Sequence, residues 1–363
     1  MSTREKILPA VYPPVNAYLH QSALFSMLFA RDECIPWIYN NFLQVYSLKD
    51  LYLHTHRPEA VDFYYNLYGD FRLYYFRANP WIRYSAMPLS DLNIIKMDYI
   101  DFLKYCIDRN QYLYFYVDRY YIPVYINHFM QRHQKHGIFI YGYDDETANF
   151  FICDHIVFGK CKQDKVAYKD LLVGLGYIGD PDGELRQMKE WQTQLYRMEV
   201  MDKAEVRRFD DQFEKDMFEI NISQIVSGVK EYLLESDYIH HYDFSKFYVF
   251  GLDCYDELSK YAGHAAHTNQ QIDIRGFYSF SMHKKMMALR LDYLSERYGV
   301  GEIAASYGML VKDFEILINM IILANVKQSE KSKLRIIDKL ADIKKRETAL
   351  LREFINCVGE SYA

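Results

Sequence analysis

An imidazole and a carboxylate with the spacing of a catalytic pair stand at the two ends of one short segment. His136 precedes the apolar run Gly137 to Tyr143, and Asp154 follows a second run, Asn149 to Cys153, with a polar turn at 144–147. This pattern predicts a β-hairpin whose antiparallel pairing would bring Asp154 beside His136. A carboxylate there fixes the imidazole tautomer, so the pair predicts the base and orienting acid of a nucleophilic triad. The alternative is a hairpin histidine in an ordinary hydrogen bond.

The element expected to present a nucleophile to this pair is a helix near the N-terminus. Residues 7–15 carry three prolines and should be extended. Asn16 then stands at a suitable N-cap position for a helix over Ala17 to Phe29. The first turn of a helix lies at the positive end of its dipole, where the pKa of a thiol is lowered. Alanine occupies that place at position 17.

The periodicity of the remaining chain predicts an α+β fold in two domains. The run from Tyr112 to Tyr125 is typical of a central strand, and with the 136–154 hairpin it predicts an antiparallel sheet packed on the first helix. The glycine-rich stretch from Gly174 to Gly183 indicates the boundary, so residues 1–180 form the catalytic domain and 181–363 an all-helical domain. Other helices are expected at 35–46, 90–110, 127–135, 218–234, 255–261, 279–298, 303–326 and 329–357.

Composition excludes several classes of protein. The 363 residues include 43 basic and 49 acidic side chains, a net charge of −6 without a basic run, so nucleic acid and anionic membranes are not expected partners. We find no apolar core of a signal peptide and no membrane span, which predicts a cytoplasmic protein. The six scattered cysteines and the histidines of 240–241 and 264–267 lack metal-ligand spacing, so neither a metal nor a disulfide framework is expected.

The order of these features resembles that of papain-like cysteine enzymes: an extended arm, a helix that opens on the nucleophile, and a later histidine-led strand with a carboxylate one hairpin away. Over most of the chain, phrases resemble the papain-like acyltransferases and amide synthases of natural-product assembly lines, of the butirosin acyltransferase type. These phrases are VNAYLHQSALFSML, NFLQVYSLKDL, YGYDDETANFFICDH, FGLDCYDELSKY and DIRGFYSFSMHKKMMALRLDYL.

The resemblance implies a papain-like domain with a triad of residue 17, His136 and Asp154, in which Ala17 replaces the nucleophilic cysteine. The cysteine was either exchanged to trap an intermediate or lost naturally, and the retention of the other two residues favours exchange. The implied function, in nonribosomal peptide biosynthesis, is transfer of an acyl group from a carrier-protein thioester through an acyl-cysteine to an amine. No cofactor is implied, and the helical domain would cover the cleft. A papain-like peptidase or amidase and a non-catalytic binding protein are the alternatives.

Several further residues are weaker candidates. Asn16 or Tyr12 could supply an oxyanion donor, His20 could line the site or be a satisfied helix histidine, and His283 could face the acceptor channel or belong to the core. Ser22, Ser26 and Cys34 are minor alternative nucleophiles, Asp144 and Asp145 are expected to form the turn, and Cys153 should be a core thiol on the strand face opposite Asp154.

Overall fold

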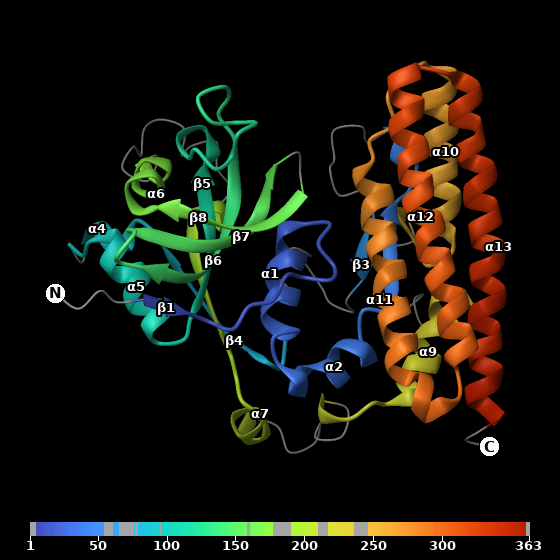
Figure 1. The fold of residues 1–363 in the computed structure, drawn as a ribbon, viewed down its shortest axis with the longest axis horizontal. Coiled ribbons are helices and arrows are strands. Elements are labelled where there is room, and N and C mark those ends of the chain that lie inside the picture. Colours follow the sequence, from blue (N-terminus) through green and yellow to red (C-terminus); the bar gives the residue numbers. More distant parts are fainter. Residues whose placement is uncertain are drawn as a thin grey trace. The chain divides into compact units, whose positions relative to one another are not determined.

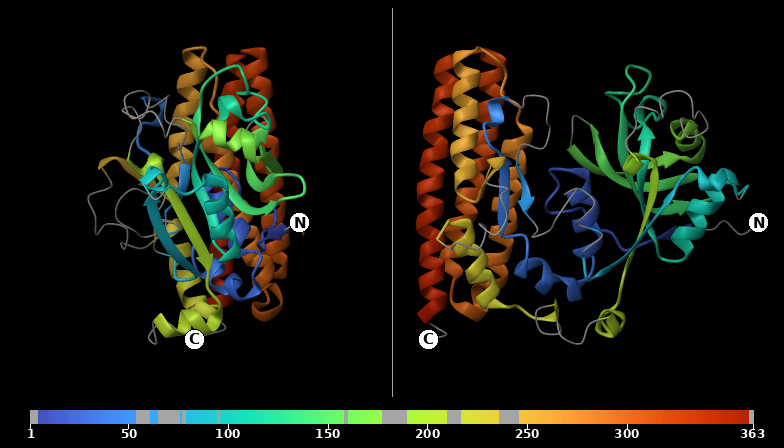
Figure 2. Two further views of the ribbon diagram at one scale, coloured as in Figure 1. Left: turned by 90° about the vertical axis from the view of Figure 1, so that its left-hand side faces the viewer. Right: turned by 180° about the vertical axis from the view of Figure 1, so that it is seen from behind.

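A computed structural model describes residues 5–53, 61–64, 76, 79–94, 96–157, 160–176, 190–209, 217–235 and 246–360. It contains an antiparallel sheet and a helical C-terminal region, in agreement with the predicted mixture of the two structure types (Figures 1 and 2). The chain forms two compact units, Met1–Ile35 with Tyr68–Met217, and Pro36–Leu67 with Phe218–Ala363. The sequence predicts a single boundary near residue 180, whereas each unit consists of two stretches of chain.

The first unit is built on a seven-stranded antiparallel sheet in the order β4-β9-β5-β6-β7-β8, with β1 paired to β6. The predicted hairpin is confirmed, because β6 and β7 pair across the turn at 145–148. The central strand ends at Asp118, earlier than predicted, because its carboxylate accepts the N–H groups of Tyr120 and Gln134 and fixes a turn there. The strands are β1 (Glu5–Ile7), β4 (Ile82–Pro88), β5 (Tyr112–Asp118), β6 (Lys135–Asp144), β7 (Asn149–Val157), β8 (Lys160–Ala167) and β9 (Gln194–Val200).

Helix α1 (Leu19–Leu28) is a core element of this unit, since all ten of its residues are buried. It packs on β6 and β7 (Figure 1). Gly137 permits this close approach, because a Cβ at that position would lie 2.5 Å from the Tyr114 hydroxyl and 2.8 Å from Leu19 Cδ2. The unit also contains α4 (Asp91–Ile94), α5 (Tyr99–Asp108), α6 (Tyr168–Gly174), α7 (Lys203–Phe209) and the 3₁₀ helices η1 (Asp32–Cys34), η3 (Arg119–Tyr121) and η6 (Glu190–Thr193). The helix predicted at 127–135 is wrong; turns and the start of β6 occupy it.

The second unit is a bundle of long helices, and their periodicity was sufficient to predict them. Its described residues include a small sheet as well, so the expectation of an all-helical domain is wrong. Strand β2 (Gln44–Leu48) lies between β10 (Tyr248–Phe250) and β3 (Val61–Tyr64), and this pairing draws residues 36–67 into the unit. The helices are α2 (Ile35–Asn40), η2 (Leu51–Leu53), α9 (Ile222–Tyr232), α10 (Asp253–His267), α11 (Arg275–Tyr298), α12 (Gly301–Lys327) and α13 (Glu330–Glu360).

Arg290 of α11 binds the segment of residues 39–42 to the helical bundle. Its fully buried guanidinium donates to the backbone carbonyls of Tyr39, Asn41 and Phe42. Because a buried cation needs such acceptors, the segment after α2 is held in place on α11. Among the helices that the structure describes, none combines the length and the apolar character needed to cross a bilayer.

Candidate functional site

Helix α1 begins two residues later than predicted, and this changes the setting of position 17. The helix starts at Leu19, and its N-cap is Tyr18 rather than Asn16. The side-chain amide of Asn16 instead donates backwards, to the Pro13 carbonyl at 3.0 Å and to the Tyr12 hydroxyl at 3.2 Å. Ala17 therefore lies just outside the first turn, and its N–H donates to Oε1 of Gln21 at 3.2 Å.

His136 lies near the start of β6, half-buried and paired with Val117 of β5. Its Nδ1 donates to the carbonyl of Gly137 at 3.1 Å, which leaves a lone pair on Nε2. Burial, reinforced by the guanidinium of Arg119 and opposed by Asp154, lowers the pKa of His136 to about 3. The imidazole is thus neutral at pH 7 and has the protonation state of a base.

Asp154 is fully buried, but its carboxylate is held by groups other than His136. The guanidinium of Arg119 donates to Oδ1 at 2.8 Å, and the Tyr125 hydroxyl donates to Oδ2 at 2.5 Å. Although burial favours the neutral acid, Arg119 and His136 outweigh it and lower the pKa of Asp154. No hydrogen bond joins Asp154 to His136 among the described residues, so the carboxylate acts on the imidazole through its charge rather than by orienting the ring directly.

His155, which the sequence analysis did not consider, reaches the start of α1. Neighbouring residues of a strand point to opposite faces, so His155 points away from the Asp154 side chain. Its Nε2 donates to the backbone carbonyl of Asn16 at 2.8 Å, one residue from Ala17. Burial lowers the pKa of His155, with Asp154 acting in the opposite direction. The sequence could have identified His155 through the alternation of side chains along a strand, which puts residue 155 on the face opposite residue 154.

The remaining residues near α1 are mostly engaged. His20 is buried and stacks on Tyr18 with ring centroids 5.5 Å apart. The Tyr12 side chain is half exposed, yet its hydroxyl donates to the Cys161 carbonyl at 3.4 Å while accepting from Asn16. Since Asn16 donates to two acceptors already, neither residue offers an unengaged donor to an oxyanion.

The minor candidates behave as structural residues. Ser22 and Ser26 are buried in α1, and their hydroxyls donate to the carbonyls of Tyr18 and Val11. Burial raises the pKa of the Cys34 thiol, which argues against a nucleophile there. Asp144 is confirmed as a turn former, because it accepts three hydrogen bonds from Glu146 and Thr147.

The expectations for Asp145 and Cys153 can be checked in part. Asp145 accepts from the Tyr168 hydroxyl and pairs with Lys104, and Cys153 is confirmed as a buried thiol. Within the described ranges no group of three or more potential ligands could hold a metal ion. The histidines at 240 and 241 lie outside the described residues.

Of the two roles left open for His283, burial favours a place in the core, because this side chain is fully buried inside the second unit. Its Nε2 donates to the Leu43 carbonyl at 2.7 Å, and Lys284 lies 3.3 Å from its Nδ1. Burial lowers the pKa of His283 well below its ordinary value. The residue therefore belongs to the core of the helical unit.

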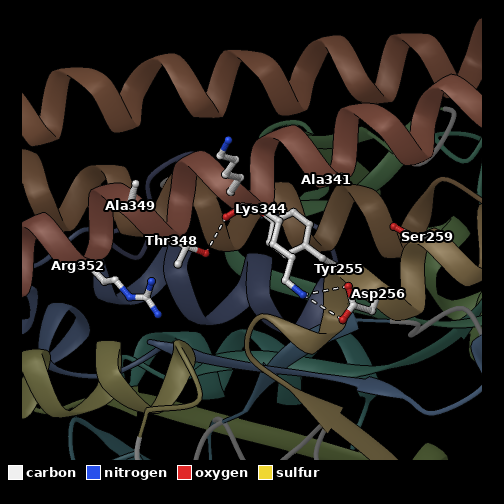
Figure 3. Close-up of a pocket in the computed structure, with 9 residues that line it drawn as sticks. Tyr255, Asp256, Ser259, Ala341, Lys344, Thr348, Ala349 and Arg352 are labelled. Carbon is white, nitrogen blue, oxygen red and sulfur yellow. Dashed lines mark hydrogen bonds and ion pairs between the residues drawn. The ribbon is translucent and has the colours of Figure 1, made fainter.

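A hollow of about 510 Å³ lies between α10 and α13 of the helical unit (Figure 3). Its charges largely neutralise each other: Lys344 pairs with Asp256 at 2.9 Å, and Arg352 pairs with Glu235 at 2.8 Å. This leaves the hollow without a convergent set of groups aimed at a ligand. Tyr255, Ser259, Ala341, Lys345, Thr348 and Ala349 complete its lining.

Comparison with known proteins adds no assignment, since neither a family model nor a curated protein matches the chain.

Proposed function

We propose that the first unit is a papain-like acyl-transfer domain in which residue 17 is the position of the nucleophile. The chief support is the contact between the segment that carries residue 17 and a histidine of the sheet: His155 holds the Asn16 carbonyl at 2.8 Å. A helix packed on a sheet, with its N-terminal segment bonded to a strand histidine, is compatible with thiol acyl transfer, which needs a base within reach of the nucleophile.

In this proposal His136 is the general base and His155 is a positioning residue. The free Nε2 lone pair of His136 suits proton abstraction. Its pKa is about 3 in a surrounding that contains the Arg119 cation. The proposal requires Nε2 of His136 to reach a thiolate at residue 17, whose negative charge would raise this pKa towards the range of a working acid and base.

The reaction then proceeds in two transfers. A cysteine thiolate at residue 17 attacks the carbonyl carbon of an acyl thioester and expels the carrier thiol, which leaves an acyl-cysteine. His136 removes a proton from an incoming amine, whose nitrogen forms the new amide and releases the cysteine. The backbone N–H of residue 17, which donates to Gln21 in this structure, would turn to the developing oxyanion. The donor is a carrier-protein thioester and the acceptor is a small amine.

A binding protein without catalysis is the second candidate, and it has support of its own. Ala17 cannot attack a carbonyl, its N–H is engaged, and Asp154 is neutralised by Arg119. Such a site could hold an acyl group without transferring it. The two candidates differ in what a thiol at residue 17 would do.

The decisive experiment installs that thiol. The Ala17→Cys protein is incubated with a short-chain acyl thioester of N-acetylcysteamine, and its intact mass is followed before and after addition of a diamine. We expect an acyl adduct that the original protein lacks and that the diamine discharges into an amide. Ala23→Cys, which makes the same exchange in α1 beyond its first turn, is the matched control for helix position.

Two double variants separate the histidines. His136→Ala in the Ala17→Cys background should abolish discharge by the amine, whereas His155→Ala should weaken both steps without changing their pH dependence. Absence of an adduct in Ala17→Cys, together with unchanged binding of the thioester, would favour the binding protein.

A further inference from the structure

Two cysteines of the first unit lie in contact across neighbouring strands. Cys153 of β7 and Cys161 of β8 have their Sγ atoms 3.5 Å apart. In the register of the two strands Cys153 stands opposite Gln163, and His155 stands opposite Cys161, so both thiols project from the same face of the sheet. Both are free cysteines and both are buried.

Helix α1 covers this pair with two serines one turn apart. Ser22 lies within hydrogen-bonding reach of Cys161, and Ser26 lies within reach of Cys153. The backbone carbonyl of Cys161 also accepts from the Tyr12 hydroxyl. The two thiols thus contact the helix whose first turn follows residue 17.

The two thiols differ in acidity. The contact with Cys153 lowers the pKa of Cys161, although burial acts against this. The same contact raises the pKa of Cys153, and burial adds to the rise. We take Cys161, on the edge strand β8, as the attacking thiol and Cys153, on the inner strand β7, as its protonated partner. This is the arrangement of an attacking and a resolving cysteine.

Cys161 is buried, but β8 is the edge strand of its sheet path, so local opening of β8 would admit an oxidant. Edge strands open locally at lower free-energy cost than central ones. Cys161 is flanked by two exposed side chains, those of Lys160 and Lys162. This part of the strand therefore lies at the solvent-facing side of the unit.

From these contacts we infer that Cys153 and Cys161 are an oxidation site at which a peroxide converts two thiols into a disulfide beneath α1. The thiolate of Cys161 attacks one oxygen of hydrogen peroxide, breaks the O–O bond and forms a sulfenic acid, while hydroxide leaves and takes up a proton as water. The sulfur of Cys153 then attacks the Cys161 sulfur, the S–S bond forms, and the sulfenic oxygen leaves as a second water. Two electrons pass from the two sulfurs to the peroxide.

The test uses the unaltered chain. The protein is treated with hydrogen peroxide, denatured, alkylated with N-ethylmaleimide and digested. Of its six cysteines, two should be lost to alkylation, and a peptide pair joined through Cys153 and Cys161 should appear and vanish after reduction. Cys34 and Cys254, whose thiol pKa values are raised by burial, provide internal controls that should remain alkylated.

Variants distinguish resolution from simple oxidation. Cys153→Ala should leave Cys161 as a sulfenic acid that dimedone traps, and Cys161→Ala should leave Cys153 unmodified. Cys34→Ala is the matched control and should behave like the original chain. Retention of all six alkylatable thiols, or oxidation of Cys161 beyond the sulfenic acid without a cross-link in the unaltered chain, would overturn the inference. This test does not depend on a nucleophile at residue 17.

Discussion

In the described part of each unit an ion pair is buried together with tyrosine hydroxyls, and the two pairs differ in what surrounds them. In the helical unit Lys284 and Glu347 lie 2.9 Å apart, both fully buried, and Glu347 accepts from the hydroxyls of Tyr232, Tyr255 and Tyr307. In the sheet unit Arg119 donates to Asp154, which also accepts from the Tyr125 hydroxyl. Unlike the pair of the helical unit, this pair acts electrostatically on a half-buried histidine, His136.

The comparison shows that a buried charge is not by itself evidence of a site. The Glu347 carboxylate has its acceptor capacity filled by an ammonium and three hydroxyls, and the rings of Phe280 and Tyr232 pack on the Lys284 nitrogen. It has the character of a structural crosslink. The Asp154 pair instead biases a titratable imidazole that is partly open to solvent, and this is what a functional carboxylate does. The following predictions test that contrast.

The largest effect is expected at the crosslink. Glu347→Gln removes the anion and leaves the ammonium of Lys284 buried without its counter-charge, so unfolding should become easier by about 3–5 kcal/mol. The measurement is equilibrium urea unfolding. The double variant Lys284→Met with Glu347→Leu should recover most of this loss, because an apolar pair of similar size needs no counter-charge. A single variant as stable as the original would contradict the structural role.

A smaller loss of stability is expected at the candidate site. Asp154→Asn keeps the shape and one acceptor for Tyr125 but removes the charge opposite Arg119, so we expect a loss of about 2–3 kcal/mol. Tyr125→Phe, which removes only the hydroxyl, should cost about 1 kcal/mol. If Asp154→Asn proved as costly as Glu347→Gln, the two pairs would have the same structural character and the contrast would fail.

The pH dependence of stability should identify the imidazole. His136 has a pKa of about 3 in the folded protein, below the ordinary 6.5, so the unfolded chain binds more protons between these values. Its contribution is therefore present above pH 6.5 and is lost as the pH falls towards 3. We expect His136→Gln to flatten the unfolding free energy over this window by about 1–2 kcal/mol after allowance for solvent screening. An identical slope in the variant would show that the imidazole is not held neutral.

The smallest effect is expected at the hollow of the helical unit. Lys344→Ala and Arg352→Ala each remove one partner of an exposed ion pair, at Asp256 and Glu235. Thermal unfolding should change by no more than about 0.5 kcal/mol, and less in high salt. A change of several kilocalories per mole would show that these pairs are more like the buried crosslink than their exposure suggests.

The sequence predicted what local periodicity controls and missed what non-local pairing controls. The β6–β7 hairpin and the long C-terminal helices were predictable because their hydrophobic repeats are contiguous. The membership of β2 in the helical unit was not, because it depends on β10, far along the chain.

The site shows the same limit at the level of single residues. The expected proximity of His136 and Asp154 followed from the hairpin alone. The ion pair of Asp154 with Arg119 depends on the turn after β5, which no local sequence pattern predicts. The contact of His155 with Asn16 depended on which face of the sheet α1 covers. The sequence left the role of His283 open, because a buried polar residue on a long helix has the same spacing as one that lines a channel.

The pairing of β2 with β10 has a consequence for synthesis of the chain. Leu48 pairs with Tyr248, so 200 residues separate the two partners. At about 5–20 residues per second a ribosome needs on the order of 10–40 seconds to deliver the second strand after the first. All five residues of β2 are buried in the finished protein, so for that time β2 has β3 beside it but its other edge, which β10 covers later, has no strand to pair with. The helical unit is therefore completed last although its first strand is synthesised early. We expect that strand to bind a chaperone until β10 has been synthesised.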